Sequence, residues 1–337
     1  MQGRMWELSI PLRSPFATAV GQIAERRVVL VSISDGIETG WGEAAPYPGV
    51  TPDTLDDAWR TLERGSVLSP TATAALEEAT ADLKARRNRE PLWKTIGGVS
   101  RPIQTSVAVG LDEDPVDRVT TTGAGAVKLK IRPGDDVARV EDVRSAFPNM
   151  PIGVDANGSY EWGDRKSLLA MDALGVDYIE QPFRADDLTS HALLRDEIVA
   201  AVALDEPIDS EVSAIRVIEA GACDILVVKP ARVGMIAARA IHDMALTAGL
   251  RIKASGLLET EIGRGFTLAI ATLPAAVFSD IAEASWFLAG TVEGKDSISS
   301  TVDISPSSGP GIGFNPDPAV FARYVVAESD LGSRIWD

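Results

Sequence analysis

The chain has 337 residues and a formal net charge of −17 at pH 7, which argues against a nucleic-acid partner because binding to phosphates needs a basic surface. Its one cysteine, Cys223, excludes an intrachain disulfide and a thiolate metal cluster. No segment approaches the roughly 20 apolar residues of a membrane span, and the N-terminus lacks signal-peptide character, so we expect a cytoplasmic protein without membrane contact.

The first part of the chain predicts a small α+β domain. The segments MWELSIPL, RRVVLVSISDG and IETGWGEAAP are typical of a three-strand antiparallel meander, with a tight turn at Asp35 and Gly36. Two helices should follow, one starting near Thr51 and one through TATAALEEATADLKARR. We expect residues 1–98 to form this α+β capping domain.

The middle of the chain repeats one strand and one helix. Short runs rich in valine and isoleucine alternate with helical stretches such as DDVARVEDVRSAF and MIAARAIHDMALTAG. Six runs follow one another at a near-constant interval: AVKLKI, IGVDAN, VDYIEQP, VALDEP, CDILVVKP and RIKASG. With PIQTSVAVGL before them and AAVFSDIAE after them, the strands number eight. We therefore predict an α/β protein with a (β/α)8 (TIM-type) barrel over residues 99–291, and residues 292–337 packing back on the cap.

Each of the six runs ends in a polar residue, and these residues recur every 24 to 26 positions. They are Lys130, Asp155, Glu180, Asp205, Lys229 and Ser255. Active sites of such barrels lie at the C-terminal ends of the strands, so we expect these side chains to share one rim.

Three of these residues are carboxylates on consecutive strands, namely Asp155, Glu180 and Asp205. Like charges held together repel unless a cation neutralises them. An all-oxygen site favours a hard divalent ion, so we predict Mg²⁺, with Mn²⁺ as a possible substitute. The competing interpretation is that these acids pair with lysines or cap the following helices.

Two lysines flank the carboxylates. Lys130 lies one unit before Asp155 and Lys229 one unit after Asp205, so they should face each other across a bound ligand. A metal ion and a facing lysine suggest removal of a proton next to a carboxylate. Lys128 either assists Lys130 through its charge or pairs with an acid, and no role is assigned to Lys253.

These motifs, in this order and spacing, resemble those of the enolase superfamily, in the muconate lactonizing enzyme subgroup with a Lys-x-Lys pair. The resemblance covers nearly the whole length and rests on ALEEATADLKARRNREPLWKTIGG, Lys128-Leu129-Lys130, Asp155-Ala156-Asn157, Glu180-Gln181-Pro182, Leu204-Asp205-Glu206, Lys229-Pro230 and the Ser255 to Thr260 run. It implies that Asp155, Glu180 and Asp205 are Mg²⁺ ligands and that Lys130 and Lys229 are the acid–base pair.

Within this subgroup the details are most similar to the o-succinylbenzoate synthase family of menaquinone biosynthesis. That resemblance implies that Lys130 abstracts the proton and returns it to the departing hydroxyl, while Lys229 offers a cation to the ring. The backbone at Ser255 and Gly256 would meet the succinyl carboxylate. The other candidates for binding the small carboxylate substrate are Lys128, Arg132 and Asn157, with Phe16, Ala17 and Tyr47 as candidate lid residues.

Alternative functions use the same residues. In N-acylamino acid racemases and dipeptide epimerases the two lysines exchange protons with opposite faces of the alpha carbon. The epimerases resemble one another in an Asp-x-Asp signature on the last strand, where this chain has Ser279-Asp280-Ile281-Ala282-Glu283, which matches it loosely. A cycloisomerase of the muconate type and a non-catalytic binding barrel are weaker alternatives. A homo-oligomer is possible, but no patch in the sequence indicates one.

Overall fold

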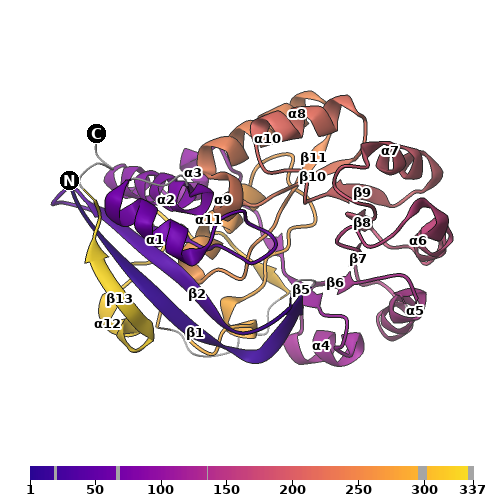
Figure 1. Cartoon of the computed structure of the whole chain (residues 1–337), viewed down its shortest axis with the longest axis horizontal. Coiled ribbons are helices and arrows are strands. Elements are labelled where there is room, and N and C mark those ends of the chain that lie inside the picture. The colour runs from indigo at the N-terminus through magenta and orange to yellow at the C-terminus, as the bar shows by residue number, and fades with distance from the viewer. Residues whose placement is uncertain (19–20, 66–68, 135, 295–301, 333–337) are drawn as a thin grey trace.

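The computed structural model describes residues 1–18, 21–65, 69–134, 136–294 and 302–332. An antiparallel cap sheet lies at one side of the molecule, and a ring of parallel strands with outer helices lies at the other (Figure 1). The predicted fold class, a capped α/β barrel, is confirmed. Among the described residues, none of the helices is both long and apolar enough to cross a membrane.

The cap sheet has the strand order β13-β1-β2-β3. Its strands are β1 (Gln2–Thr18), β2 (Gly21–Ser34), β3 (Thr39–Ala44) and β13 (Val325–Asp330). The first three are the predicted meander, and the turn at Asp35 and Gly36 is confirmed, since Gly36 has a φ of 88° that suits a glycine. β13 pairs with β1, so the C-terminal strand completes the cap. The domain boundaries at residues 98 and 291 stay predictions.

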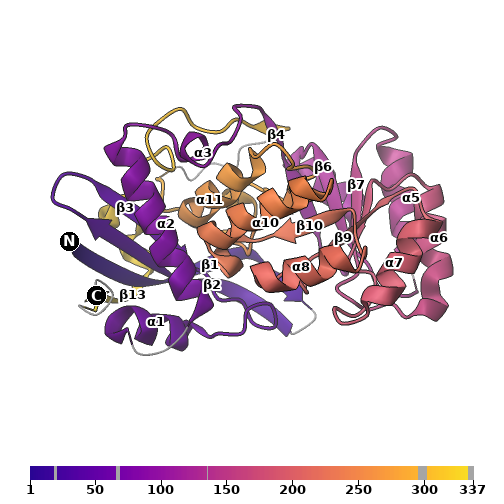
Figure 2. The same cartoon turned by 90° about the horizontal axis from the view of Figure 1, so that it is seen from above.

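Two helices cover one face of this sheet: α1 (Leu55–Arg64) and α2 (Pro70–Arg87). Thr54 caps α1 and Ser69 caps α2 by accepting hydrogen bonds from the first turns. α2 packs unusually close to β3, because a Cβ on Gly40 would lie 2.1 Å from Ala79 O. From above, α2 is seen between the cap sheet and the barrel helices (Figure 2).

The barrel contains seven regular parallel strands in sequence order. They are β5 (Ser106–Val109), β6 (Ala126–Lys130), β7 (Ile152–Asp155), β8 (Tyr178–Glu180), β9 (Ala201–Leu204), β10 (Ile225–Val228) and β11 (Arg251–Ala254). Buried valine, isoleucine and leucine dominate them, as expected for strands covered on both faces. The six runs that carry the polar strand ends are all confirmed as strands.

The eighth strand is irregular. The predicted strand AAVFSDIAE forms two isolated parallel bridges with the β11 segment, Ile252 to Ala276 and Ser255 to Asp280. Ser106 N on β5 donates to Ile281 O at 3.2 Å, which closes the ring. A regular ladder is interrupted because Phe278 adopts a φ of 47°.

The prediction that PIQTSVAVGL forms one strand was wrong, because the segment divides into two strands at Thr105. β4 (Ile103–Gln104) pairs antiparallel with β12 (Asp303–Ile304), whereas β5 joins the barrel. The remaining helices are α3 (Leu92–Thr95), α4 (Pro115–Thr122), α5 (Asp136–Ala146), α6 (Arg165–Ala173), α7 (Leu188–Glu197), α8 (Glu211–Glu219), α9 (Pro230–Val233), α10 (Met235–Thr247), α11 (Glu261–Ala271), α12 (Pro318–Phe321) and the 3₁₀ turns η1 (Trp162–Asp164), η2 (Ala284–Trp286) and η3 (Ala322–Tyr324).

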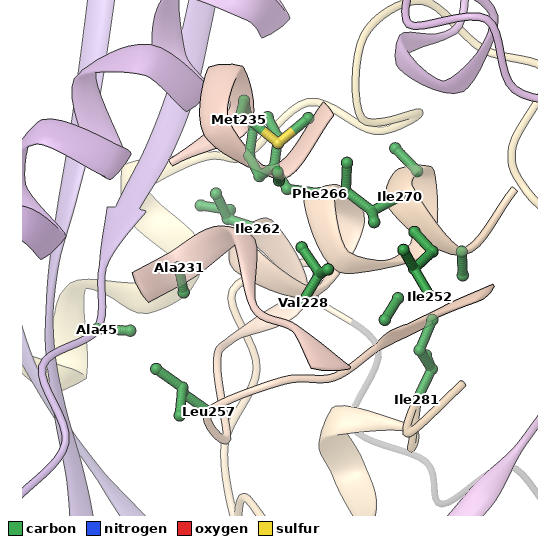
Figure 3. Close-up of a cluster of buried hydrophobic side chains, with 14 of the residues drawn as sticks. Ala45, Val228, Ala231, Met235, Ile252, Leu257, Ile262, Phe266, Ile270 and Ile281 are labelled. Atoms are coloured by element: carbon green, nitrogen blue, oxygen red, sulfur yellow. The ribbon is translucent and has the colours of Figure 1, made fainter. Parts of the chain in front are cut away.

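One apolar core runs from the cap into the barrel (Figure 3). It joins Ala45, just after β3, to Leu257 and Ile262 beside the start of α11 and to Val228 on β10. All four side chains are buried. Burying this shared apolar surface holds the cap over the rim of the barrel, at about 25 cal/mol per Å² of apolar area.

Candidate active site

The polar strand ends meet at one rim of the barrel, as predicted. Lys130 is the register partner of Asp155, and Asp155 is the partner of Glu180. Asp205, Lys229 and Ser255 each follow directly after a strand. The three acids are buried, with exposed fractions of 1% for Asp155, 0% for Glu180 and 4% for Asp205.

Lys128 lies among three carboxylates. Its Nζ is 2.7 Å from Asp155 Oδ2, 2.7 Å from Glu180 Oε1 and 2.9 Å from Asp280 Oδ2. Burial acts to lower the pKa of Lys128, but the three carboxylates outweigh it and raise that pKa well above its ordinary value. Lys128 is therefore a permanent ammonium, which is the ion-pair alternative of the two sequence interpretations.

Lys130 reaches out of the same strand toward the open side of the rim. Its Nζ is 2.7 Å from Asp155 Oδ2 and 2.6 Å from Asn157 Oδ1. A quarter of its side chain is exposed, against 7% for Lys128. Asn157 in turn donates from Nδ2 to Glu206 Oε1 at 3.0 Å. Of the two lysines on β6, Lys130 is the more accessible to a ligand.

Lys229 stands on the other side of the carboxylates. It forms a short ion pair with Asp205, whose other oxygen accepts from Arg232 Nη2 at 3.1 Å. Burial acts to raise the pKa of Asp205, but Lys229, Arg232 and Lys128 outweigh it, so that pKa lies below its ordinary value. Asp205 therefore stays ionised.

Lys253, to which the sequence analysis assigned no role, is fully buried beneath the rim. Its Nζ lies 2.9 Å from Glu180 Oε2, forms a short ion pair with Asp280, and sits 4.9 Å from the centre of the Tyr178 ring. Lys128 thus binds one oxygen of Glu180 and Lys253 binds the other, and both lysines contact the same oxygen of Asp280. The two lysines supply part of the positive charge that the sequence analysis assigned to a metal ion.

The three predicted ligands suit a divalent ion in their chemistry. Asp155, Glu180 and Asp205 offer buried carboxylate oxygens from consecutive strands, which hard cations prefer. Within the described ranges, no three acid, histidine or cysteine side chains are grouped to hold an ion. The cations beside these oxygens are Lys130 on Asp155, Lys128 between Asp155 and Glu180, and Lys229 on Asp205. Binding of a metal ion by the same oxygens would compete with these ion pairs.

The remaining predicted residues are placed as follows. Ser255 is buried, and its N–H donates to Val228 O at 3.0 Å, so the barrel itself uses this group and Gly256 remains the backbone candidate. Arg132 is exposed in the loop after β6. The side chains of Phe16 and Ala17 lie outside the described residues.

Tyr47 lies in a plain turn, where Val50 N donates to Tyr47 O at 3.0 Å. Its ring is buried under the Arg26 guanidinium, 5.1 Å from ring centre to Cζ. Burial raises the pKa of the Tyr47 hydroxyl, which has no hydrogen-bond partner among the described residues. The two histidines, His191 and His242, lie in helices α7 and α10, and the Nε2 atom of each accepts a hydrogen bond from a backbone amide, that of Phe183 and that of Ala275 respectively.

Sequence reasoning missed two residues of this site. Asp280 lies 25 residues after Ser255 and continues the regular interval, so the repeat itself was the signal for it. Arg232 follows Lys229 by one helical turn, and its Nη2 also donates to the carbonyl groups of Asp205 and Ile208. A buried arginine directly after a strand-end lysine has no sequence signal that separates it from an ordinary helix residue.

Comparison with known proteins agrees with this geometry. A family model described as Enolase C-terminal domain-like matches residues 113–320, and one described as Mandelate racemase / muconate lactonizing enzyme, N-terminal domain matches residues 49–97. An o-succinylbenzoate synthase of Geobacillus kaustophilus is 32% identical, with 94% of both chains covered. An N-succinylamino acid racemase of Thermus thermophilus is 34% identical over 79% of this chain and 81% of the relative.

Solved structures share the architecture. The dipeptide epimerase from Enterococcus faecalis V583, crystallised with Mg and the dipeptide L-Leu-L-Tyr, superimposes with a TM-score of 0.84, covering 93% of this chain and 99% of that one. Its sequence identity is 23%, so this likeness concerns the fold.

Proposed function

The chain belongs to the enolase superfamily, in the mandelate racemase and muconate lactonizing enzyme family, and from that premise we propose that it is an o-succinylbenzoate synthase. The reaction would convert 2-succinyl-6-hydroxy-2,4-cyclohexadiene-1-carboxylate to 2-succinylbenzoate with loss of water. The observation that carries the proposal is the pair Lys130 and Lys229 on opposite sides of a row of buried carboxylates. Identity of 32% to a synthase over nearly the full length supports it.

In the proposed mechanism Lys130 acts as both base and acid. As a free amine it takes the proton from the carbon next to the substrate carboxylate. The same Nζ then gives this proton to the hydroxyl group, which leaves as water with the electrons of its C–O bond while the ring becomes aromatic. Lys130 suits this double task because its side chain is the accessible one of the Lys-x-Lys pair.

Two further groups assist in this mechanism. Lys229 faces Lys130 and offers an ammonium to the ring, an interaction of roughly 0.5–2 kcal/mol. Enzymes of this superfamily use a divalent metal ion. We propose Mg²⁺, with Mn²⁺ as a substitute, held by Asp155, Glu180 and Asp205; when bound it supplies positive charge to the substrate carboxylate.

The second candidate is racemisation of N-succinylamino acids. The 34% identity to the racemase of Thermus thermophilus favours it, and in that reaction Lys229, which pairs with Asp205, would serve as the second acid–base group. The two functions differ in what Lys229 must do, because a racemase needs it to exchange protons whereas the synthase needs its charge. Asp280 is ion-paired with Lys128 and Lys253. It therefore differs from a carboxylate that is available to bind the ammonium group of a substrate.

Direct assays distinguish the two functions. Purified protein with Mg²⁺ would be given the cyclohexadiene precursor, and separately N-succinyl amino acids of single handedness. Loss of the diene absorbance at a kcat/KM at least tenfold above that for racemisation is the expected result. Racemisation is monitored by optical rotation. A kcat/KM for racemisation that equals or exceeds the value for loss of the diene would reverse the order of the two candidates.

Magnesium binding is expected to stabilise the folded protein. An ion that binds only the native state adds about 2.7 kcal/mol at a concentration 100 times its Kd, so Mg²⁺ should raise Tm. Asp155→Asn should remove this rise. Asp224→Asn is a matched control, because Asp224 pairs with Arg195 away from the rim, and it should keep the rise. An equal response of both variants in a thermal scan would contradict the assigned metal site.

A further inference from the structure

A buried carboxylate from the cap reaches the barrel near the candidate active site. Glu43, near the end of β3, has no exposed surface. Its Oε1 accepts from Thr260 N at 3.0 Å, and its Oε2 accepts from Gly263 N at 3.0 Å and from the Thr260 hydroxyl. These partners lie 217 and 220 positions further along the chain. Thr260 is the N-cap residue of the barrel helix α11, and Gly263 lies in the first turn of that helix.

The position of this contact has a clear physical basis. The first N–H groups of a helix have no partner within the helix, and the helix dipole favours a negative group beside them. Close approach depends on Gly263, since a Cβ there would lie 3.1 Å from Glu43 Oε2 and 2.7 Å from the Cβ of Glu259. Glu43, a residue of the cap domain, therefore serves as an N-capping group for the barrel helix α11.

Two other interactions hold the same segment. Arg26 on β2 is buried and donates to Leu258 O at 3.3 Å, while its other nitrogens bind Ala45 O and Pro46 O in the cap. Ala45 also packs in one apolar cluster with Leu257 and Ile262 (Figure 3). The stretch from residue 257 to residue 263 is thereby tied to the cap by charge, hydrogen bonds and apolar contact.

We propose that Glu43 is a positioning residue, which fixes the loop from Ser255 to Thr260 against the cap so that Gly256 and the cap face the same bound carboxylate substrate. Glu43 touches no reacting atom in this role and acts through Thr260 and Gly263. The substrate's identity rests on the proposed function, whereas the link between Glu43 and the loop does not.

Glu43 should also leave a signature in the pH dependence of stability. Burial is the largest cause that raises its pKa, from 4.5 to about 7, and Glu259 adds to it, against the lowering effect of the Thr260 and Gly263 hydrogen bonds. The charged groups that face Glu43 are Glu259 in the loop, Arg26 on β2 and Glu78 on α2.

The sign follows from proton uptake. Between pH 4.5 and 7 the folded state holds the Glu43 proton more tightly than the unfolded chain does, so this group stabilises the fold at low pH and the benefit fades as pH rises to 7. The unfolding equilibrium constant should rise by roughly two powers of ten over this range relative to Glu43→Gln, since each pKa unit is a factor of ten. Urea titrations of both proteins from pH 4.5 to 8 measure this difference, and parallel curves would contradict it.

The positioning role is tested with Glu43→Gln and a matched control, Asp82→Asn. Asp82 is also fully buried in the cap and accepts from backbone amides, Trp41 N at 3.0 Å and Ile312 N at 2.8 Å, but it does not touch the loop. We expect Glu43→Gln to raise KM at least tenfold with kcat within threefold of the unaltered enzyme. Amide exchange of Thr260 and Gly263 should accelerate at least tenfold while α8 is unchanged.

Asp82→Asn should lower Tm and leave both KM and these amides as they were. Glu43→Asp, which keeps a carboxylate on a shorter side chain, should raise KM less than Glu43→Gln does. If the glutamine variant does not fold, Glu43→Asp takes its place in the KM and amide-exchange measurements only, with smaller expected increases. An unchanged KM and unchanged exchange in the Glu43 variant, or an equal rise of KM in Asp82→Asn, would overturn the proposal. If the unaltered protein turns over neither substrate, the proposed function fails, and amide exchange alone then decides the role of Glu43.

Discussion

Replacing Lys130 by methionine is expected to lower kcat by a factor of about 10³ or more, since a positioned acid–base group contributes 10²–10⁴-fold and Lys130 is proposed to serve in two proton transfers. The fold should survive this change. Asp155 keeps its ion pair with Lys128 at 2.7 Å, so no buried carboxylate loses its last cation. The measurement is steady-state loss of diene absorbance, with Tm recorded for each protein.

The matched control is Lys94→Met, which removes a lysine that is 58% exposed and pairs with Glu90 four residues away. It should retain the kcat of the unaltered enzyme. Lys130→Arg keeps the positive charge but does not supply a free amine near neutral pH, and it should be nearly as inactive as the methionine variant. Retention of a tenth or more of kcat in Lys130→Met would exclude this lysine as the acid–base group.

Replacing Lys253 by methionine is expected to lower the free energy of unfolding by about 3–5 kcal/mol, the usual result of removing one partner from a buried ion pair. Methionine has a similar length, so the loss comes from charge rather than from a cavity. The side chain is fully buried and is the second cation on both Glu180 and Asp280, which then depend on Lys128. Urea unfolding at pH 7.5 measures the loss.

A double variant separates charge from packing. In Lys253→Met with Asp280→Asn, the acid that has lost one of its two cations is also removed, so part of the lost stability should return. The double-mutant cycle reports the coupling between the two side chains. Lys94→Met again serves as the surface control, with an expected change within about 0.5 kcal/mol. A loss below 1 kcal/mol for Lys253→Met would show that the buried lysine does little to hold the barrel interior together.

The candidate site was largely predictable because it follows a local pattern. Lys130, Asp155 and Glu180 are the last residues of β6, β7 and β8, and parallel strands bring such residues to one rim whatever the rest of the chain does. The same interval reaches Asp280, which the sequence analysis considered only as part of a loose match to the epimerase signature. The eighth strand itself proved irregular, since the backbone turns at Phe278 for reasons that no local propensity signals.

The charge balance of the site was less predictable. The sequence predicts three convergent carboxylates and a metal ion, and the structure adds two buried cations: Lys128 lies between Asp155 and Glu180, and Lys253 lies between Glu180 and Asp280. Whether an acid faces a lysine side chain or a metal ion depends on side-chain directions inside the barrel, which strand spacing does not determine. Lys253 lies two residues before Ser255, and alternation along a strand places it on the interior face but names no partner.

The order of the strands, the rim that carries the polar residues and the presence of a cap can be predicted from the amino-acid sequence, because apolar periodicity and strand-end chemistry are local properties of the chain. How the cap meets that rim depends on contacts that form only in the folded chain. Glu43 binds the start of α11 at a separation of 217 residues, and Arg26 binds Leu258 across 232. Such contacts are selected by which surfaces pack together and by the need to satisfy buried N–H and C=O groups there, and both arise only when the whole chain is folded.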